Sequence, residues 1–176
     1  ILVLEDTAWG CGGQLGGRNL GTIGDAGAFS FDYAKTITTG EGGMVVASDP
    51  QALLRAKAYH DHGHENNPQL PRWEDSRSSS GFNYRMTEMQ GAVGLAQLAK
   101  LNKVVEHQRY VHHLFAQKLD SPTIWMREQP EGANGTADAF TFFVKDADVA
   151  LQVRAALLDA GYATKILPEA ISWHFA

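Results

Sequence analysis

A single lysine lies in a sequence setting that could make its amine reactive. Lys35 follows a short apolar segment at residues 28–32, precedes the glycine turn at residues 40–43, and has no other lysine before it in the chain. Its near neighbours are mostly apolar or hydroxylic, and partial desolvation disfavours an ammonium, so that a nucleophilic amine forms more easily. Most lysines are solvated surface charges. The position of Lys35 therefore predicts a reactive amine only together with other side chains that could take part in the same chemistry.

Two other side chains could be such partners. Asp6 follows the aliphatic run that opens the chain, and Ser30 lies in a second predicted strand. Ligand-contacting groups in α/β proteins lie at the carboxyl ends of strands, although Asp6 alone could equally cap the turn that follows it. An amine, a carboxylate and a hydroxyl beside glycine turns are what pyridoxal 5'-phosphate requires. A lysine binds this cofactor covalently, an acid keeps its ring nitrogen protonated, and hydroxyl and backbone N–H groups hold its phosphate.

The elements expected around these residues alternate between strands and helices. Strands are predicted at residues 1–4, 28–32 and 44–47, and a helix is predicted from Pro50, with Asp49 as its N-cap, towards His60. A long polar loop follows at residues 60–80. Thr87 with Gln90 forms a capping-box pattern, and the apolar spacing after it predicts one long helix, or two in series, as far as Leu119. The fold class is therefore α/β.

The last third of the sequence predicts a smaller α/β unit. We expect strands at residues 123–126, 140–144 and 163–167, a loop at residues 129–135, and a helix at residues 147–160 that ends at Gly161.

The chain begins without Met inside an apolar run and stops in an aromatic one, so we expect a fragment of a longer protein. The composition is that of a globular protein: the chain has 176 residues, of which 44% are hydrophobic, and its formal charge is -5. The sequence has no basic stripe that would favour nucleic acid as a partner. It also has no apolar segment long enough to cross a membrane. Cys11 is the only cysteine, so we expect the cytoplasm.

Several blocks of the sequence closely resemble the DegT/DnrJ/EryC1/StrS family of sugar aminotransferases, which use pyridoxal 5'-phosphate. These blocks are residues 5–9, residues 21–31, Lys35 with residues 39–43, and residues 81–86, in the family's order and spacing. The resemblance implies a fold-type-I transferase and a homodimer with shared active sites. Residues 1–120 would be the C-terminal part of the large cofactor-binding domain with its bridging helix. Residues 121–176 would be part of the small C-terminal α/β domain.

The same resemblance implies a role for each candidate residue. Lys35 would bind the cofactor and act as the catalytic acid and base, Asp6 would pair with the pyridine nitrogen, and Ser30 would bind the phosphate. Trp9 stands where the family more often has Gln or His over the cofactor ring, and its π-face could stack there. Asn83 matches a residue that reaches the cofactor phosphate of the partner subunit. Histidine replaces the lysine in a dehydratase branch, so Lys35 favours amino transfer.

The reaction implied is transfer of an amino group, with glutamate as the expected donor, to a keto- or aldehydo-sugar for lipopolysaccharide or amino-sugar biosynthesis. Residues 30–38, residues 61–64 and the pair Trp173 and His174 are most similar to enzymes that form 8-amino-3,8-dideoxy-manno-octulosonate, an amino version of the lipopolysaccharide sugar Kdo. The small-molecule partners would be the sugar and the amino acid. Without the rest of the family's cofactor cage, we expect the chain alone to be inactive.

A second hypothesis comes from a different class of protein. His60, His62 and His64 alternate in a segment that also contains Asp61 and Glu65, and imidazole with carboxylate suits zinc. These residues would make the protein a metal-dependent hydrolase or a metal-binding protein. The alternative is a polar loop just past a helix end, where histidines interact favourably with the last carbonyls. A dinucleotide loop at residues 10–15 is not expected, because Leu15 stands where the pattern needs its last glycine.

Overall fold

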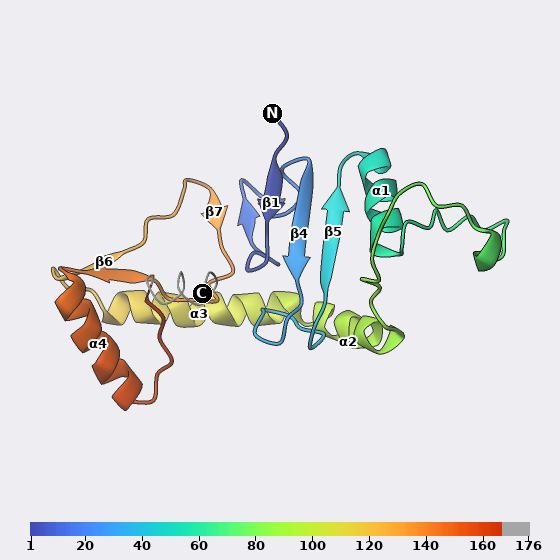
Figure 1. Ribbon diagram of the computed structural model, residues 1–176. Helices are drawn as coiled ribbons and strands as arrows, with labels where there is room; N and C mark the ends of the chain where they lie inside the picture. The colour runs from blue at the N-terminus through green and yellow to red at the C-terminus, as the bar shows by residue number, and fades with distance from the viewer. Residues whose placement is uncertain (167–176) are drawn as a thin grey trace. The chain divides into compact units, whose positions relative to one another are not determined.

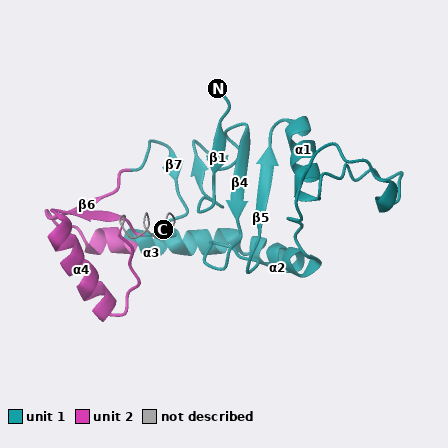
Figure 2. Ribbon diagram, in the orientation of Figure 1, with its two compact units in different colours: residues 1–113, 129–139 teal, residues 114–128, 140–176 magenta. Residues whose placement is uncertain are grey.

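The computed structural model describes residues 1–166, which divide between two compact units (Figure 2). Unit 1 contains residues 1–113 and 129–139, and unit 2 contains residues 114–128 and the described residues after 139. The chain therefore leaves unit 1, returns to it for one short segment and leaves again. No described helix is long and apolar enough to cross a membrane.

The main sheet of unit 1 has the strand order β1-β4-β5 (Figure 1). Its strands are β1 (Leu4–Asp6), β4 (Ala26–Ser30) and β5 (Gly43–Ala47). β1 runs parallel to β4, with Asp6 opposite Ala28, and β5 runs antiparallel to β4. The parallel pair brings the carboxyl ends of β1 and β4 to the same edge of the sheet.

The predicted strand at residues 1–4 is wrong at its start. β1 begins at Leu4, and residues 1–3 are exposed rather than buried. The backbone N–H of Val3 donates to a carboxylate oxygen of Asp25 at 2.7 Å, so a side chain takes the place of a ladder partner there. The predicted strands at residues 28–32 and 44–47 are confirmed as β4 and β5, with β4 placed two residues earlier.

The connection from β1 to β4 is held by one carboxylate and two glycines. Glu5 accepts hydrogen bonds from the backbone N–H groups of Gly21 (2.7 Å), Ile23 (2.6 Å) and Gly24 (2.6 Å). Gly21 has a φ of +85°, and a Cβ built on Gly27 would lie 2.2 Å from the carbonyl oxygen of Gly21. Side chains are therefore excluded from this close backbone approach.

The helices of unit 1 begin where their capping signals predict. α1 (Pro50–His60) starts after Asp49, whose carboxylate accepts from the N–H groups of Gln51 and Ala52. α2 (Glu88–Leu98) starts after Thr87, which forms a capping box with Gln90. α3 (Leu101–Lys118) follows at once, so the long helical stretch consists of two helices in series.

Unit 1 also contains a small second sheet that the sequence pattern did not predict. Its order is β3-β2-β7, formed by β2 (Gln14–Leu15), β3 (Arg18–Asn19) and β7 (Ala133–Asn134). β7 lies inside the loop predicted at residues 129–135. Arg109 of α3 holds this return segment, because its guanidinium donates to the carbonyls of Asn134 (2.9 Å) and Gly135 (2.8 Å) and also to Gly12 (3.3 Å).

Unit 2 pairs two strands beside one helix. β6 (Ile124–Met126) and β8 (Phe142–Val144) are antiparallel, and α4 (Ala147–Asp159) is capped by the Asp146 carboxylate. A mostly apolar cavity of about 430 Å³ lies between these elements. The strand predicted at residues 163–167 is wrong for residues 163–166, which pair with no strand of the described chain. At the end of α4, the N–H of Tyr162 donates to the carbonyl of Leu157 at 2.8 Å. Leu167, like Trp173 and His174, lies outside the described residues.

Candidate active site

Asp6 lies at the edge of the main sheet where the two parallel strands end. Its neighbour Thr7 is buried, and both the backbone N–H (2.9 Å) and the hydroxyl (2.8 Å) of Thr7 donate to the carbonyl of Ala28 on β4. The Asp6 side chain itself is exposed, and its carboxylate accepts from the N–H of Ala8 at 3.1 Å. Two hydrogen bonds therefore hold the end of β1 against β4, while the Asp6 carboxylate keeps acceptor capacity for a further partner.

Lys35 and Trp9 meet directly. The Nζ atom of Lys35 lies 3.7 Å from the centroid of the Trp9 ring, within the range of a cation–π interaction. Trp9 is 47% exposed, and Lys35 is half-buried. Trp9 comes from the turn that follows β1, and Lys35 comes from the loop that follows β4. The structure therefore brings the predicted nucleophile to the turn that begins at Asp6.

The loop that carries Lys35 is closed by its own hydrogen bonds. The N–H of Lys35 donates to the carbonyl of Asp32 at 3.1 Å, and the N–H of Thr39 donates to the carbonyl of Phe31 at 2.9 Å. Ser30, half-buried at the end of β4, accepts a long hydrogen bond of 3.4 Å from the N–H of Asp32. The Ser30 hydroxyl proton therefore remains available to a ligand.

The hydroxyl of Thr36 is the group in this loop that most needs a partner. Its Oγ1 atom is buried and has no hydrogen-bond partner, although buried hydroxyls almost always have one. An amine against an aromatic face, an exposed carboxylate and two hydroxyls with unused donors form the set that pyridoxal 5'-phosphate needs. The residues present therefore fit this cofactor.

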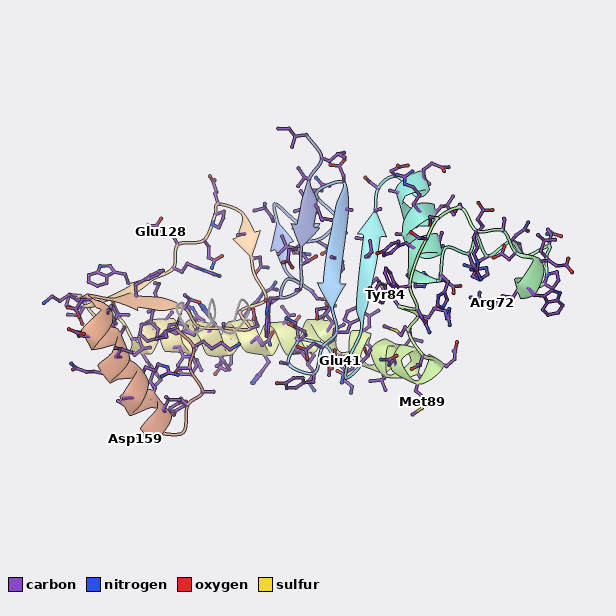
Figure 3. The ribbon with its side chains drawn as sticks, viewed as in Figure 1. Glu41, Arg72, Tyr84, Met89, Glu128 and Asp159 are labelled. Atoms are coloured by element: carbon purple, nitrogen blue, oxygen red, sulfur yellow. The ribbon has the colours of Figure 1, made fainter. Side chains whose placement is uncertain are left out.

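Asn83 lies in a different part of unit 1 from these residues. It belongs to residues 81–85, here called the Asn83 segment, which pairs with the end of α1 through a bridge between Asp61 and Asn83. Figure 3 shows Tyr84 beside α1, and the Tyr84 ring lies 6.3 Å from that of Tyr59, centroid to centroid. No interaction in the described part of the chain joins Asn83 to Lys35, Asp6 or Trp9.

The histidine segment does not form a metal site in the structure. His60 Nδ1 lies 2.5 Å from the carbonyl oxygen of Lys57, and His64 Nδ1 lies 3.2 Å from a carboxylate oxygen of Asp75. His62 has a φ of +56°, so the chain turns there instead of running extended. Within residues 1–166 no three His, Cys, Asp or Glu side chains group closely enough to hold a metal ion. The metal hypothesis depended on an extended chain, and that expectation is wrong.

Asp61, which lies within this segment, is instead the centre of a charge cluster. It is 4% exposed and accepts two hydrogen bonds from Arg72, at 2.6 and 3.0 Å, and another from Arg85. The Arg72 guanidinium, aided by Arg85, holds the pKa of the Asp61 carboxyl far below its ordinary value against the opposing effect of burial. Asp61 therefore stays ionised and joins the long loop to the Asn83 segment.

The roles of three of these residues were not predicted from the sequence. Glu5 lies in one of the family-like blocks without a role of its own, although side chains alternate along a strand, so the carboxylates of Glu5 and Asp6 face opposite ways. That alternation could have assigned the loop-holding role to Glu5. Asp61 was predicted only as a carboxylate beside the histidines, and Thr36 had no predicted role. The environments of both depend on the folded chain: Asp61 is bound by Arg72 and Arg85, and the Thr36 hydroxyl is buried.

Several known proteins are similar to this chain in sequence or in fold. GDP-perosamine synthase from Caulobacter vibrioides is 40% identical over 119 residues, which is 68% of this chain and 31% of that protein. The crystal structure of the aminotransferase TlmJ from Streptoalloteichus hindustanus has a TM-score of 0.83 and 27% identity, covering 94% of this chain and 44% of that one. The protein Spr1654 from Streptococcus pneumoniae, in its PLP form, has a TM-score of 0.81 at 20% identity. The match covers 94% of this chain and 43% of that one, and it shows the fold alone.

The fold is that of the fold-type-I transferases, and the chain spans about a third of the length of the curated relative above. The family model for the DegT/DnrJ/EryC1/StrS aminotransferases matches residues 1–172, almost the whole chain. This chain therefore belongs to the DegT/DnrJ/EryC1/StrS aminotransferase family.

Proposed function

We propose that the protein containing this chain is a pyridoxal-phosphate-dependent aminotransferase that moves an amino group from glutamate to a keto- or aldehydo-sugar. One observation carries the proposal: the Lys35 amine lies 3.7 Å from the centroid of the Trp9 ring, at the turn that begins with Asp6. The amine, the ring and the acid of the predicted site therefore come from two adjoining loops. Family membership supports the same reaction class.

Each residue then has a chemical task. The bound cofactor would supply an electron sink for the reacting carbon. Lys35 would hold the cofactor between half-reactions and then move the proton at the substrate carbon. Asp6 would keep the ring nitrogen protonated, Trp9 would cover the ring, and Ser30 would donate to the phosphate. Asn83 would donate to the phosphate of the cofactor in the partner subunit. The donor leaves as its 2-oxo acid while the sugar carbonyl becomes an amine, so the exchange needs no outside oxidant.

We also propose a cytoplasmic homodimer with shared sites, in which this chain is part of a longer protein. The apolar surface of unit 1 supports contact with further parts of a longer protein: Leu4, Phe82 and Tyr84 are 74%, 54% and 65% exposed. Such surface suits contact with further protein. The assembled protein would be active where the chain alone is not.

For the sugar, we propose formation of 8-amino-3,8-dideoxy-manno-octulosonate. Support comes from residues 30–38 and 61–64, which resemble enzymes with that product. A relative named GDP-perosamine synthase supports a nucleotide-linked keto-sugar instead. Release of 2-oxoglutarate from glutamate, measured with each sugar in turn, separates the two substrates.

The central test is chemical trapping in the complete protein. Borohydride treatment of the cofactor-loaded protein should remove its near-visible absorbance and leave a reduced adduct on the peptide containing Lys35. Lys35→Ala should abolish both signals, while Lys57→Ala, which changes an exposed lysine of α1, should change neither. An adduct on any other lysine would refute the proposal.

A further inference from the structure

We infer that Asp61 is a positioning residue, which holds the Asn83 segment in place to serve the active site of the partner subunit. This inference rests on the proposed function, in which Asn83 donates to the partner's cofactor phosphate. The Asp61 carboxylate is a buried charge, and it is not part of the candidate active site of its own chain. No interaction within residues 1–166 joins Asp61 to Lys35, Asp6 or Trp9.

The charge of Asp61 is balanced by two arginines from different places. Arg72 comes from the long loop and binds both carboxylate oxygens, and Arg85 comes from the Asn83 segment itself. Burial of an ionised carboxylate is costly unless it is paired and hydrogen-bonded. The pairing therefore makes the position of Arg85, two residues after Asn83, depend on Asp61.

The backbone of the Asn83 segment follows the end of α1 closely. The N–H of Phe82 donates to the carbonyl of Tyr59 at 2.9 Å, and the N–H of Tyr84 donates to the carbonyl of His60 at 2.9 Å. A Cβ on Gly81 would lie 2.3 Å from the carbonyl oxygen of Tyr59, so only glycine allows this approach. The Asp61 side chain thus holds the Asn83 segment, which backbone hydrogen bonds already align with the end of α1.

The surface of the segment suits an anion carried by a second copy of the chain. Asn83 is exposed, and its Oδ1 accepts a long hydrogen bond of 3.4 Å from the N–H of Arg85, which leaves its amide N–H groups for a ligand. The side chains of Arg72 and Arg85 are 49% and 41% exposed. Asp61 and also Asp75 hold the pKa of Arg72 above its ordinary value, so both guanidiniums are balanced by carboxylates. The amide N–H groups of Asn83 are therefore the donors that the segment offers to a phosphate.

The first experiment measures cofactor affinity rather than activity. Cofactor-free complete protein is titrated with pyridoxal 5'-phosphate, and the near-visible absorbance of the Lys35 linkage is followed. Asp61→Asn and Arg85→Gln should weaken apparent affinity about 10- to 100-fold, the scale of a small misplacement of a contacting group. Arg55→Gln, a change at an arginine whose side chain is 73% exposed, is the matched control and should leave affinity unchanged.

The second experiment uses hybrid dimers of differently tagged subunits, Lys35→Ala in one and Asp61→Asn in the other. Only the Asp61→Asn subunit can then form the linkage. If its site takes the Asn83 segment of the Lys35→Ala subunit, affinity returns to the wild-type value. Affinity that stays as weak as in the Asp61→Asn homodimer overturns the inference.

An Asn83→Ala subunit paired with a Lys35→Ala subunit separates the two proposals. If this pair also fails to recover affinity, the cross-subunit role of Asn83 fails. If it recovers and the Asp61→Asn pair does not, only the inference about Asp61 fails. Arg85→Gln repeats the hybrid test should Asp61→Asn not fold. Unfolding of both variants would assign the cluster to general stability and would likewise overturn the inference.

Discussion

The ammonium of Lys35 rests on the face of the Trp9 ring, 3.7 Å from its centroid, although the two residues come from different loops. A half-exposed cation–π contact of this kind contributes about 0.5–1 kcal/mol. The contact restrains the lysine before any ligand arrives.

Removing the Trp9 ring should expose the Lys35 amine. In cofactor-free protein, Trp9→Leu is expected to raise the rate at which an amine-specific reagent modifies Lys35 about two- to fivefold, because the ring no longer covers Nζ. Trp9→Phe keeps an aromatic face and should have a smaller effect. Peptide mass spectrometry over time gives the rates. Trp73→Leu changes a tryptophan that is 85% exposed and serves as the control; equal rates for both leucine variants would contradict the prediction.

Asp6→Asn should separate cofactor capture from catalysis. The amide has nearly the same shape but no charge, so Lys35 should still bind the cofactor. The turnover number should fall about 10²- to 10³-fold, the scale of losing one electrostatic stabiliser. Absorbance and steady-state kinetics on the same sample measure the two effects. Asp159→Asn, at an exposed residue of unit 2, should change neither (Figure 3); unchanged turnover in Asp6→Asn would remove Asp6 from the site.

Glu5→Gln should destabilise unit 1 in a pH-dependent way. Hydrogen bonds from the N–H groups of Gly24 and Gly21 are the main reason that the pKa of Glu5 lies below its ordinary value of 4.5. A lowered pKa means that the carboxylate stabilises the fold above the ordinary value, and that this stabilisation is lost as pH falls through the folded-state value. Glutamine retains one acceptor oxygen but has no charge.

Denaturant unfolding at neutral and acidic pH tests this expectation. Wild-type protein should be more stable than Glu5→Gln at pH 7, and the difference should shrink below pH 4.5, the ordinary value. Glu106→Gln, at an exposed position of α3, provides the control and should show no such difference. A constant difference between wild type and Glu5→Gln at every pH would show that the charge of Glu5 plays no part.

Two glycine substitutions should change stability in opposite directions. Gly27→Ala places a Cβ 2.2 Å from the Gly21 carbonyl oxygen and should cost about 1–3 kcal/mol, as overpacked cores do. Gly91→Ala lies in α2 with nothing within 4 Å of the new Cβ, so it should add about 0.5–1 kcal/mol through helix propensity. The two variants are compared by the midpoints of their urea unfolding curves, at equal dependence of the unfolding free energy on urea concentration. A neutral Gly27→Ala would mean that the backbone can shift at this approach.

Helix ends could be predicted from the sequence because their signals are local. Asp49 and Thr87 each bond to backbone groups two or three residues away, so the residues that form each cap stand together in the chain. Strand ends depend on distant partners instead. The N–H of Val3 donates to the side chain of Asp25 rather than to a strand, and β7 pairs with a strand more than a hundred residues earlier. Two-residue strands also have too little periodicity to recognise.

In the candidate site, too, local signals could be predicted from the sequence and contacts between distant residues could not. Residue types and their order at strand ends indicated Asp6, Ser30 and Lys35, because parallel strands bring their carboxyl ends together. The contact between Trp9 and Lys35, and the arginines that surround Asp61, required the folded chain. Alternating histidines were misleading because positive φ at His62 breaks the extended run that the metal hypothesis assumed.

The return of residues 129–139 to unit 1 limits how this protein can be recombined. Because the backbone passes between the units three times, one breakpoint cannot exchange a whole unit between two relatives. A chimera joined near residue 120 would pair its own β2 with a foreign β7, and the foreign return segment would meet the native Arg109. A functional swap of unit 1 has to transplant both segments together, so we expect the two stretches to be inherited as one block.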